Sequence, residues 1–234
     1  MEIVEDWYIY TEYSNFLREV NFVHKEYKNR ISKLYKTPDE EANEYTKYLY
    51  ENPNEYSYIE NIEDVEPEIL RLSFERYLLV KNIKYRYLCI NILTLYQMVE
   101  QFFSSIIKMR ISISMDNELK EKYNNENFYL KDIKTFYEKD YNYEFGNNKE
   151  YQTLDELRLL ENVIKHGEGK SANDLRKIND KYFKKIPSTY PYTDTIINDN
   201  LNIDDKDFER FCNAINNFIN TMPKKFEHSY KRKK

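Results

Sequence analysis

The stretch LCINILTLYQMVEQFFSSII, residues 88–107, decides the fold of this chain. Its length and apolar character alone would admit a membrane span. Glu100 is its only charged residue, but uncharged polar side chains run along its whole length: Asn91, Thr94, Gln97, Gln101, Ser104 and Ser105. A helix that is apolar nearly all round yet carries such groups is typical of the centre of a helical bundle. The stretch therefore predicts a central bundle helix, within a helical region of about 68–112, and no membrane span.

Helical patterns continue on both sides of this stretch. Between residues 4 and 35, apolar residues recur at alternating three- and four-residue steps, a heptad-like seam that predicts a long helix packed lengthwise on a neighbour. Shorter helices are predicted at about 128–140 and 206–221. The chain has only 3 Gly and 6 Pro, too few for the turns of an all-β protein. We therefore expect an all-α helical bundle.

The whole chain, residues 1–234, is predicted to be a single domain in which helix 4–35 packs on a bundle formed by 68–221. Residues 187–203 hold several turn-forming residues and predict a small irregular or hairpin insertion. The end of the chain, PKKFEHSYKRKK (223–234), is a basic patch. A flexible, solvated tail is the favoured interpretation of it, and a nucleic-acid-binding arm is the alternative.

A second helix is predicted by TLDELRLLENVIKHGEG, residues 153–169. Thr153 and Glu156 match a capping box at its start, and Gly167 is suited to the position just past its end. Its apolar residues fall on one arc of a helical projection, and its polar residues fall on the opposite arc. The apolar arc holds Leu157, Leu159, Leu160, Val163 and Ile164, and the polar arc holds Arg158, Glu161, Asn162, Lys165 and His166.

The Gly169-Lys170-Ser171 run that follows resembles the end of a phosphate-binding loop. That motif requires a glycine five positions before Gly169, where this chain has Ile164, and it must follow a strand rather than a helix. The run is better explained as a turn between two helices. Ser171 and Asp174 predict the cap of the second of these, which would extend to about 185.

Composition limits the kinds of site that the chain can build. The net charge is −5, so no global basic field attracts nucleic acid. Cys89 and Cys212 stand far apart without a CxxC partner, and the acidic N-terminus does not suit a targeting peptide, which predicts a reduced, cytoplasmic protein. The three histidines lack metal-ligand spacing, so no metal and no cofactor is expected. Of these histidines, His24 lies in the N-terminal seam and is predicted to be packed there.

The order of these elements resembles the HEPN-like helical-bundle proteins of bacteria. The resemblance covers roughly residues 70–220 and rests on LYQMVEQFF (95–103), DIKTFYEKDYNYEF (132–145) and the helix that carries Arg158, Asn162 and His166. It implies a metal-independent endoribonuclease that acts as a toxin or antiphage defence effector. It also implies a homodimer, an RNA substrate, and a protein partner such as an antitoxin.

The chemistry that the resemblance implies centres on His166, which would act as general acid or base on the RNA 2′-hydroxyl or the leaving oxygen. Arg158 or Lys165 would stabilise charge on the phosphate, and Asn162 would orient either the phosphate or the imidazole. Glu100 would be buried and would hold Arg158 or His166 in place across the bundle.

Two features of the motif depart from the family pattern. Glu161 occupies the position directly before Asn162, where the family usually has Arg. Arg158 and His166 lie about 12 Å apart along a straight helix, so an antiparallel pair of copies would be needed to bring them together. The alternative interpretation is therefore a non-catalytic interaction or regulatory module, whose polar arc is an ordinary solvated helix face.

Overall fold

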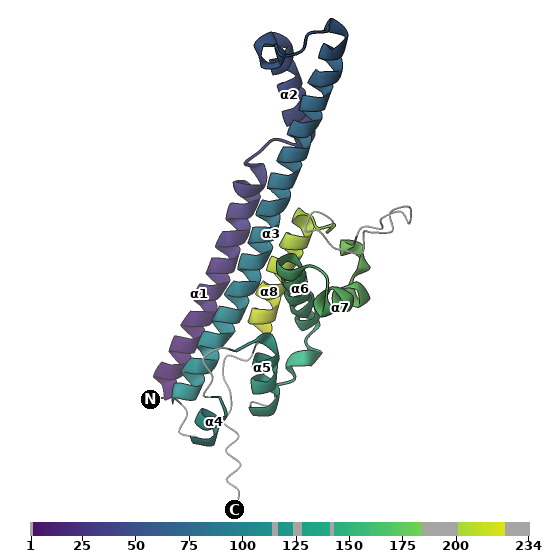
Figure 1. Cartoon of the computed structure of the whole chain (residues 1–234). Helices are drawn as coiled ribbons and strands as arrows, with labels where there is room; N and C mark the ends of the chain where they lie inside the picture. The colour runs from purple at the N-terminus through teal and green to yellow at the C-terminus, as the bar shows by residue number, and fades with distance from the viewer. Residues whose placement is uncertain (1, 114–116, 124–127, 141–142, 184–200, 223–234) are drawn as a thin grey trace, which may run out of the picture. The chain divides into compact units, whose positions relative to one another are not determined.

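The computed structural model describes residues 2–113, 117–123, 128–140, 143–183 and 201–222 (Figure 1). The chain is an all-α helical bundle, which confirms the fold class predicted from the sequence. In the described residues, β-structure is limited to one isolated antiparallel bridge between Phe183 and Leu201. The predicted insertion at 187–203, apart from its last three residues, and the tail at 223–234 lie outside the described residues.

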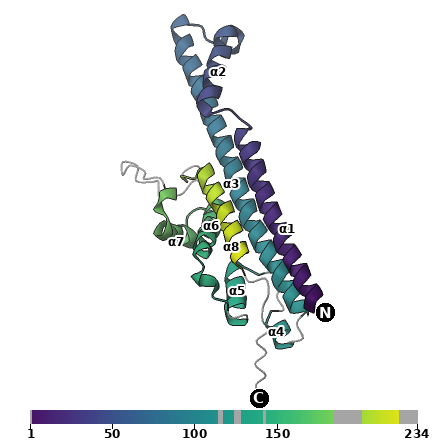
Figure 2. The ribbon, with the colours of Figure 1, turned by 180° about the vertical axis from the view of Figure 1, so that it is seen from behind.

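The chain divides into two compact units. The smaller unit is Lys25–Asn91, and the larger unit combines Met1–His24 with Ile92–Lys234. Two helices contribute to both units: α1 (Glu2–Asn29) and α3 (Val65–Ile113). Figure 2 shows both helices running without a break.

The smaller unit is built on α2 (Pro38–Glu51), which packs antiparallel to the first part of α3. A capping box begins α2, because the Glu40 N–H donates to Thr37 Oγ1 (3.2 Å) and the Thr37 N–H donates to the Glu40 carboxylate (2.9 Å). Thr46 Oγ1 donates to Ser73 Oγ at 2.7 Å and joins the two helices. Leu49, Ile69 and Val80 are buried in this unit. Short 3-10 turns complete the unit: Ile31–Lys33, Pro53–Tyr56 and Ile62–Asp64.

The larger unit is held together by aromatic rings from distant parts of the chain. Phe102 of α3 stacks on Phe16 of α1 at a centroid distance of 4.2 Å and meets the edge of Tyr13 at 5.0 Å. Phe103, one residue further along α3, contacts Phe145 (5.9 Å) and Phe218 (6.0 Å). Aromatic side chains supply large apolar areas with directional contacts, so they give this part of the bundle a defined packing.

The remaining helices of the larger unit follow α3 along the chain. They are α4 (Asn117–Lys122), α5 (Leu130–Thr135), a π-turn (Phe136–Asp140), a 3-10 turn (Phe145–Asn147), α6 (Lys149–His166), α7 (Lys170–Ile178), a 3-10 turn (Asp180–Tyr182) and α8 (Asp205–Thr221). The bounds of α8 agree with the predicted helix at 206–221 to within one residue, and Asp204 caps its start, since its side chain accepts from the Asp207 N–H at 3.0 Å.

Several predicted helix boundaries were wrong. The N-terminal helix ends at Asn29 and is followed by a separate 3-10 turn, so it does not continue to residue 35. α6 begins one turn earlier than predicted, at Lys149, because the side chain of Asn148 accepts from the Glu150 N–H at 2.9 Å and caps it there. α7 begins at Lys170, directly after Gly169, so Ser171 lies inside the helix and is not its cap. The helix ends at Ile178.

Candidate functional site

α6 is the helix that organises the larger unit, because it packs against both α7 and α8. Its buried residues form a broad arc that includes every apolar residue of the predicted apolar face. Gly167 ends the helix with φ of 72°, and its N–H donates to the Val163 carbonyl at 2.8 Å. The positive φ suits a glycine, as predicted, but ψ is −136°, so the residue does not adopt the αL form usual at a helix end.

A polar stripe remains on the opposite side of α6. We define the α6 stripe as Arg158, Asn162, Lys165 and His166. Lys165 and His166 are exposed at the end of the helix, and Arg158 and Asn162 are partly exposed. The residues therefore occupy successive turns of one helix face, as the spacing predicts.

The guanidinium of Arg158 is already bound within the chain. Its Nε lies 2.7 Å from Asp155 Oδ1. Partial burial acts to lower the pKa of Arg158, but the hydrogen bond and charge of Asp155 outweigh this effect and raise the pKa. The Asn162 side chain is also directed along the helix, since its Nδ2 donates to the Arg158 carbonyl at 2.9 Å. Arg158 thus stays charged and is held two turns away from His166.

Glu161 does not lie on the polar arc where the sequence placed it. Its side chain is buried and forms an ion pair with Lys165, one turn later on α6. The pairing has a simple cause, because a buried carboxylate needs a cation and Lys165 has a stem long enough to reach it. As a result, the amino group of Lys165 is directed toward Glu161.

Glu100 has a different partner from the one predicted. Its carboxylate accepts from the Tyr96 hydroxyl at 2.6 Å, one turn earlier on α3, and its hydrogen bonds do not go to Arg158 or His166. Burial raises the pKa of Glu100, and the nearby charge of Glu161 adds to that effect, while the Tyr96 hydroxyl and Lys165 act against it. Glu100 therefore holds a proton more readily than a free glutamate.

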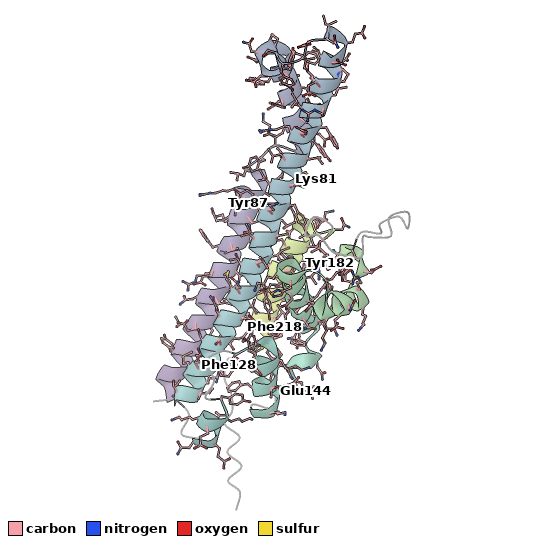
Figure 3. The ribbon with its side chains drawn as sticks, viewed as in Figure 1. Lys81, Tyr87, Phe128, Glu144, Tyr182 and Phe218 are labelled. Atoms are coloured by element: carbon pink, nitrogen blue, oxygen red, sulfur yellow. The ribbon has the colours of Figure 1, made fainter. Side chains whose placement is uncertain are left out.

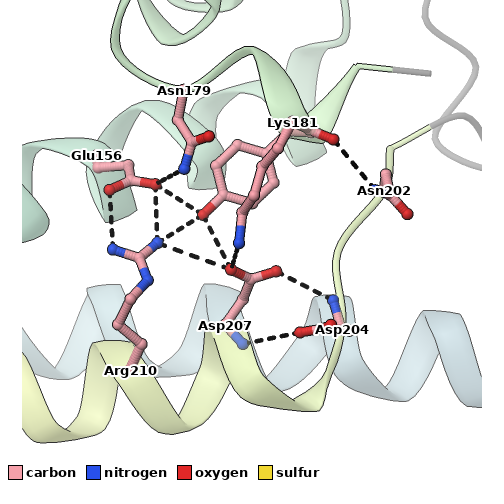
Figure 4. A network of polar contacts seen from close by, with 8 residues as sticks. Glu156, Asn179, Lys181, Asn202, Asp204, Asp207 and Arg210 are labelled. Atoms are coloured by element: carbon pink, nitrogen blue, oxygen red, sulfur yellow. Dashed lines mark hydrogen bonds and ion pairs between the residues drawn. The ribbon is translucent and has the colours of Figure 1, made fainter. Parts of the chain in front are cut away.

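A second polar cluster lies on the buried side of α6 (Figure 4). Glu156 accepts from both terminal nitrogens of Arg210 on α8, at 2.9 and 2.8 Å. Asn179 Nδ2 and the Tyr182 hydroxyl also donate to it, each at 2.8 Å. Burial alone would raise the pKa of Glu156, but these hydrogen bonds lower it. We call the group Glu156, Asn179, Lys181, Tyr182, Asp207 and Arg210 the Glu156 network.

Asp207 closes this network from the side of α8. It is buried, forms an ion pair with Lys181, and lies 3.8 Å from Arg210. Tyr182 lies between the two carboxylates, so burial and the charge of Glu156 raise the pKa of its hydroxyl. The network joins α6, the turn at Asp180–Tyr182 and α8. Its charged groups are paired with one another, which is typical of a structural cluster.

The sequence analysis missed this network, although one signal for it was present. Glu156 falls in the middle of the apolar arc of α6, where a charged residue is unexpected unless it has a partner. The sequence instead predicts a capping box between Thr153 and Glu156. That assignment was wrong because the helix begins at Lys149, which leaves Glu156 in the third turn.

The structure gives little support to a reactive cysteine or a metal site. Cys89 and Cys212 are buried and are not joined in a disulfide, and burial raises the pKa of the Cys212 thiol to about 12. Among the described residues, no group of three or more His, Cys, Asp and Glu side chains is placed to hold a metal ion. Within the same residues, no helix combines the length and the apolar character needed to cross a membrane.

Comparisons with family models, with curated proteins and with solved structures find no match to this chain.

Proposed function

We propose that this chain is a HEPN-like, metal-independent endoribonuclease that acts as a toxin or an antiphage defence effector. The observation that carries the proposal is the α6 stripe. It presents an arginine, an amide and a histidine in that order on one solvent-accessible helix face, with Glu161 in the position where the family usually has Arg. The exposed His166 is accessible to an RNA backbone without any rearrangement of the bundle.

The reaction follows from the chemistry of RNA itself. A base removes the proton of the 2′-hydroxyl, and the resulting oxyanion attacks the adjacent phosphorus. The bond from phosphorus to the 5′-oxygen breaks, and an acid protonates that oxygen as it leaves, so the products are a 2′,3′-cyclic phosphate and a free 5′-hydroxyl. Imidazole can do either proton transfer near neutral pH. A guanidinium stabilises the extra negative charge on the phosphate.

One chain alone does not assemble this site. Arg158 is fixed by Asp155 at a distance of two helical turns from His166, so the two groups cannot hold one phosphate. Two α6 stripes that meet in antiparallel orientation would place Arg158 of one copy beside His166 of the other. The proposed nuclease is therefore a homodimer with two composite sites.

The first test is to incubate the purified full-length chain with total RNA, with and without a chelator. We expect cleavage that a chelator does not affect and that His166→Ala abolishes. Gln152→Ala is the matched control, since Gln152 is also exposed and polar on α6 but lies outside the stripe. Cleavage that requires a metal ion, or that survives in His166→Ala, would rule out the mechanism.

The second test asks whether the site is shared between copies. Arg158→Ala and His166→Ala should each be inactive alone. A mixture of the two, allowed to exchange subunits, should recover about a quarter of the wild-type activity, because half of the dimers are mixed and each mixed dimer has one intact site. Recovery is impossible if Arg158 and His166 must come from the same chain.

A non-catalytic interaction module is the second candidate, and it too is favoured by specific contacts. Two cations of the α6 stripe are occupied within the chain, Arg158 by Asp155 and Lys165 by Glu161. In an active site these cations would have to exchange their carboxylate partners for a phosphate. Absence of RNA cleavage by a folded, wild-type dimer would favour this second function.

A further inference from the structure

The smaller unit has charges of opposite sign at its two ends. Residues 48–70 carry seven acidic residues and neither Lys nor Arg. Residues 76–91 carry four basic residues and neither Asp nor Glu. Residues 25–36 add five basic residues against one glutamate. We call residues 48–70 the acidic end, and residues 25–36 with 76–91 the basic end.

Contacts within the unit keep the two ends apart. α2 runs antiparallel to α3, with Arg76 Nη2 2.9 Å from Glu41 near the start of α2 and Thr46 bonded to Ser73 further along. The acidic end therefore lies where α2 ends and α3 begins. At the basic end, Lys84 Nζ donates to the Tyr35 carbonyl at 3.4 Å, which places the 25–36 segment beside the later turns of α3.

An apolar stripe lies on α3 where the charge changes sign. It consists of Leu70, Phe74 and Leu78, which follow one another at one-turn intervals and are 59%, 60% and 38% exposed. The Phe74 ring stacks on Tyr77 at 6.1 Å, and Lys81 lies over the Tyr77 ring at 5.7 Å, so the stripe continues into the basic end. Lys81 is labelled in Figure 3. Large apolar side chains in a contiguous exposed row indicate an interaction surface.

We propose that this face of the smaller unit binds the same face of a second copy of the chain, with the two α3 helices antiparallel. The surface is complementary to itself in that orientation, because each acidic end lies over the basic end of the partner copy. A two-fold interface requires this property, since residue i contacts residue j and residue j contacts residue i. The occupant is therefore a second copy rather than an unrelated basic or acidic protein.

The register follows from the apolar stripe. If the two-fold axis passes near Phe74, Leu70 of one copy opposes Leu78 of the other. Counting outward by equal steps along α3 then places Lys81 opposite Pro67, beside Glu66. Apolar contacts thus form the centre of the interface, and opposite charges form both flanks, as is usual for protein interfaces.

This inference rests on the smaller unit alone and does not depend on the proposed nuclease. It is tested with two charge-reversal variants of the full chain, Glu60→Lys/Glu63→Lys at the acidic end and Lys81→Glu/Arg86→Glu at the basic end. All four residues are exposed. Sedimentation velocity over a concentration series should show self-association of the wild-type chain that weakens as salt is added. Each variant alone should raise the dissociation constant at least tenfold.

The decisive measurement is a mixture of the two variants. In a mixed pair, both flanks regain opposite charges, so the mixture should associate about as tightly as the wild-type chain. Glu118→Lys/Glu121→Lys on α4 is the control for the acidic-end variant, with the same change of net charge on an exposed surface of the larger unit. It should leave association unchanged. Circular dichroism of each variant checks that the helices are intact.

The apolar centre is tested separately with Phe74→Ser. This variant should also weaken association at least tenfold, whereas Ile90→Ser, on another face of α3 and 54% exposed, should not. A wild-type chain that stays monomeric at tens of micromolar overturns the proposal. So does association that neither reversal affects, which would place the contact elsewhere, or a mixture that associates no better than its components.

Discussion

α6 carries two polar regions that differ in what their charges are free to do. On its buried side, Glu156 receives four hydrogen bonds from three residues, and its charge is fully matched. On its exposed side, the α6 stripe has single contacts made within the same helix, and His166 is open to solvent. Because both regions lie on one helix of 18 residues, burial rather than residue type separates a structural cluster from a candidate reactive surface.

The largest expected difference between the two regions is the effect of losing an arginine. Arg210→Ala leaves Glu156 buried without its cation and should lower the free energy of unfolding by about 3 kcal/mol. Arg158→Ala removes a partly exposed pair within one helix and should cost about 0.5 kcal/mol. Urea denaturation of both variants at neutral pH measures the difference. Equal losses would show that the Glu156 network is no more structural than the stripe.

The Tyr182 hydroxyl is the next test of the network. It donates to Glu156 and lies 2.7 Å from Arg210 Nη2, from which it accepts, so Tyr182→Phe should cost about 2 kcal/mol. Tyr96→Phe is the matched change near the stripe, where one hydrogen bond to Glu100 is lost, and it should cost about 1 kcal/mol. A lower denaturation midpoint for Tyr96→Phe than for Tyr182→Phe would contradict the expected difference between the network and the stripe.

The two glutamates of this region should respond to pH in opposite directions. The pKa of Glu156 is lowered in the folded protein, so its stabilisation is present above its ordinary pKa of 4.5 and is lost as pH falls through the folded value. The pKa of Glu100 is raised, so its stabilisation is present below 4.5 and is lost as pH rises through the folded value.

Substitution by glutamine makes this contrast measurable. Glu156→Gln should destabilise the protein at pH 7 by about 1.5 kcal/mol, with the deficit shrinking below pH 4.5. Glu100→Gln should stabilise it at pH 7 by about 0.5 kcal/mol, with the gain vanishing in acid. Thermal unfolding at pH 7 and pH 4 tests both. A loss of stability at pH 7 in Glu100→Gln would mean that Glu100 has a cationic partner after all.

The smallest expected effect concerns His166. Because its side chain is exposed at the last position of α6, His166→Ala should change the free energy of unfolding by about 0.3 kcal/mol or less. The activity measured in the same preparation then reports on chemistry and not on folding. A large loss of stability would instead identify His166 as a structural residue and remove it from the proposed site.

The sequence predicted the helices well wherever a clear apolar arc was present. The arc of α6 and the face of α8 were both identified from spacing alone, because burial of one helix face leaves a 3.6-residue period. Helix starts were predicted less well. Asn148 caps α6 one turn before the Thr153 that the sequence favoured, since several residues near a helix start can serve as caps and packing selects among them.

The partners of the side chains in the candidate site could largely not be predicted from the sequence. Glu100 was expected to be buried and to need a partner, but its nearest one is Tyr96 on the same helix. Glu161 was placed on the polar arc, although it is buried and paired with Lys165. A helical projection gives the direction of a side chain only, whereas its partners depend on which neighbouring helix covers the edge of the arc.

The boundary between the two compact units falls inside two continuous helices, α1 at residues 24–25 and α3 at residues 91–92. A protease must bind several residues of extended backbone, which a helix does not offer until it unfolds. Trypsin should therefore spare Lys25 and Arg86 near the boundary in spite of their exposure. Cleavage at these positions should therefore follow unfolding of α1 and α3 and not precede it.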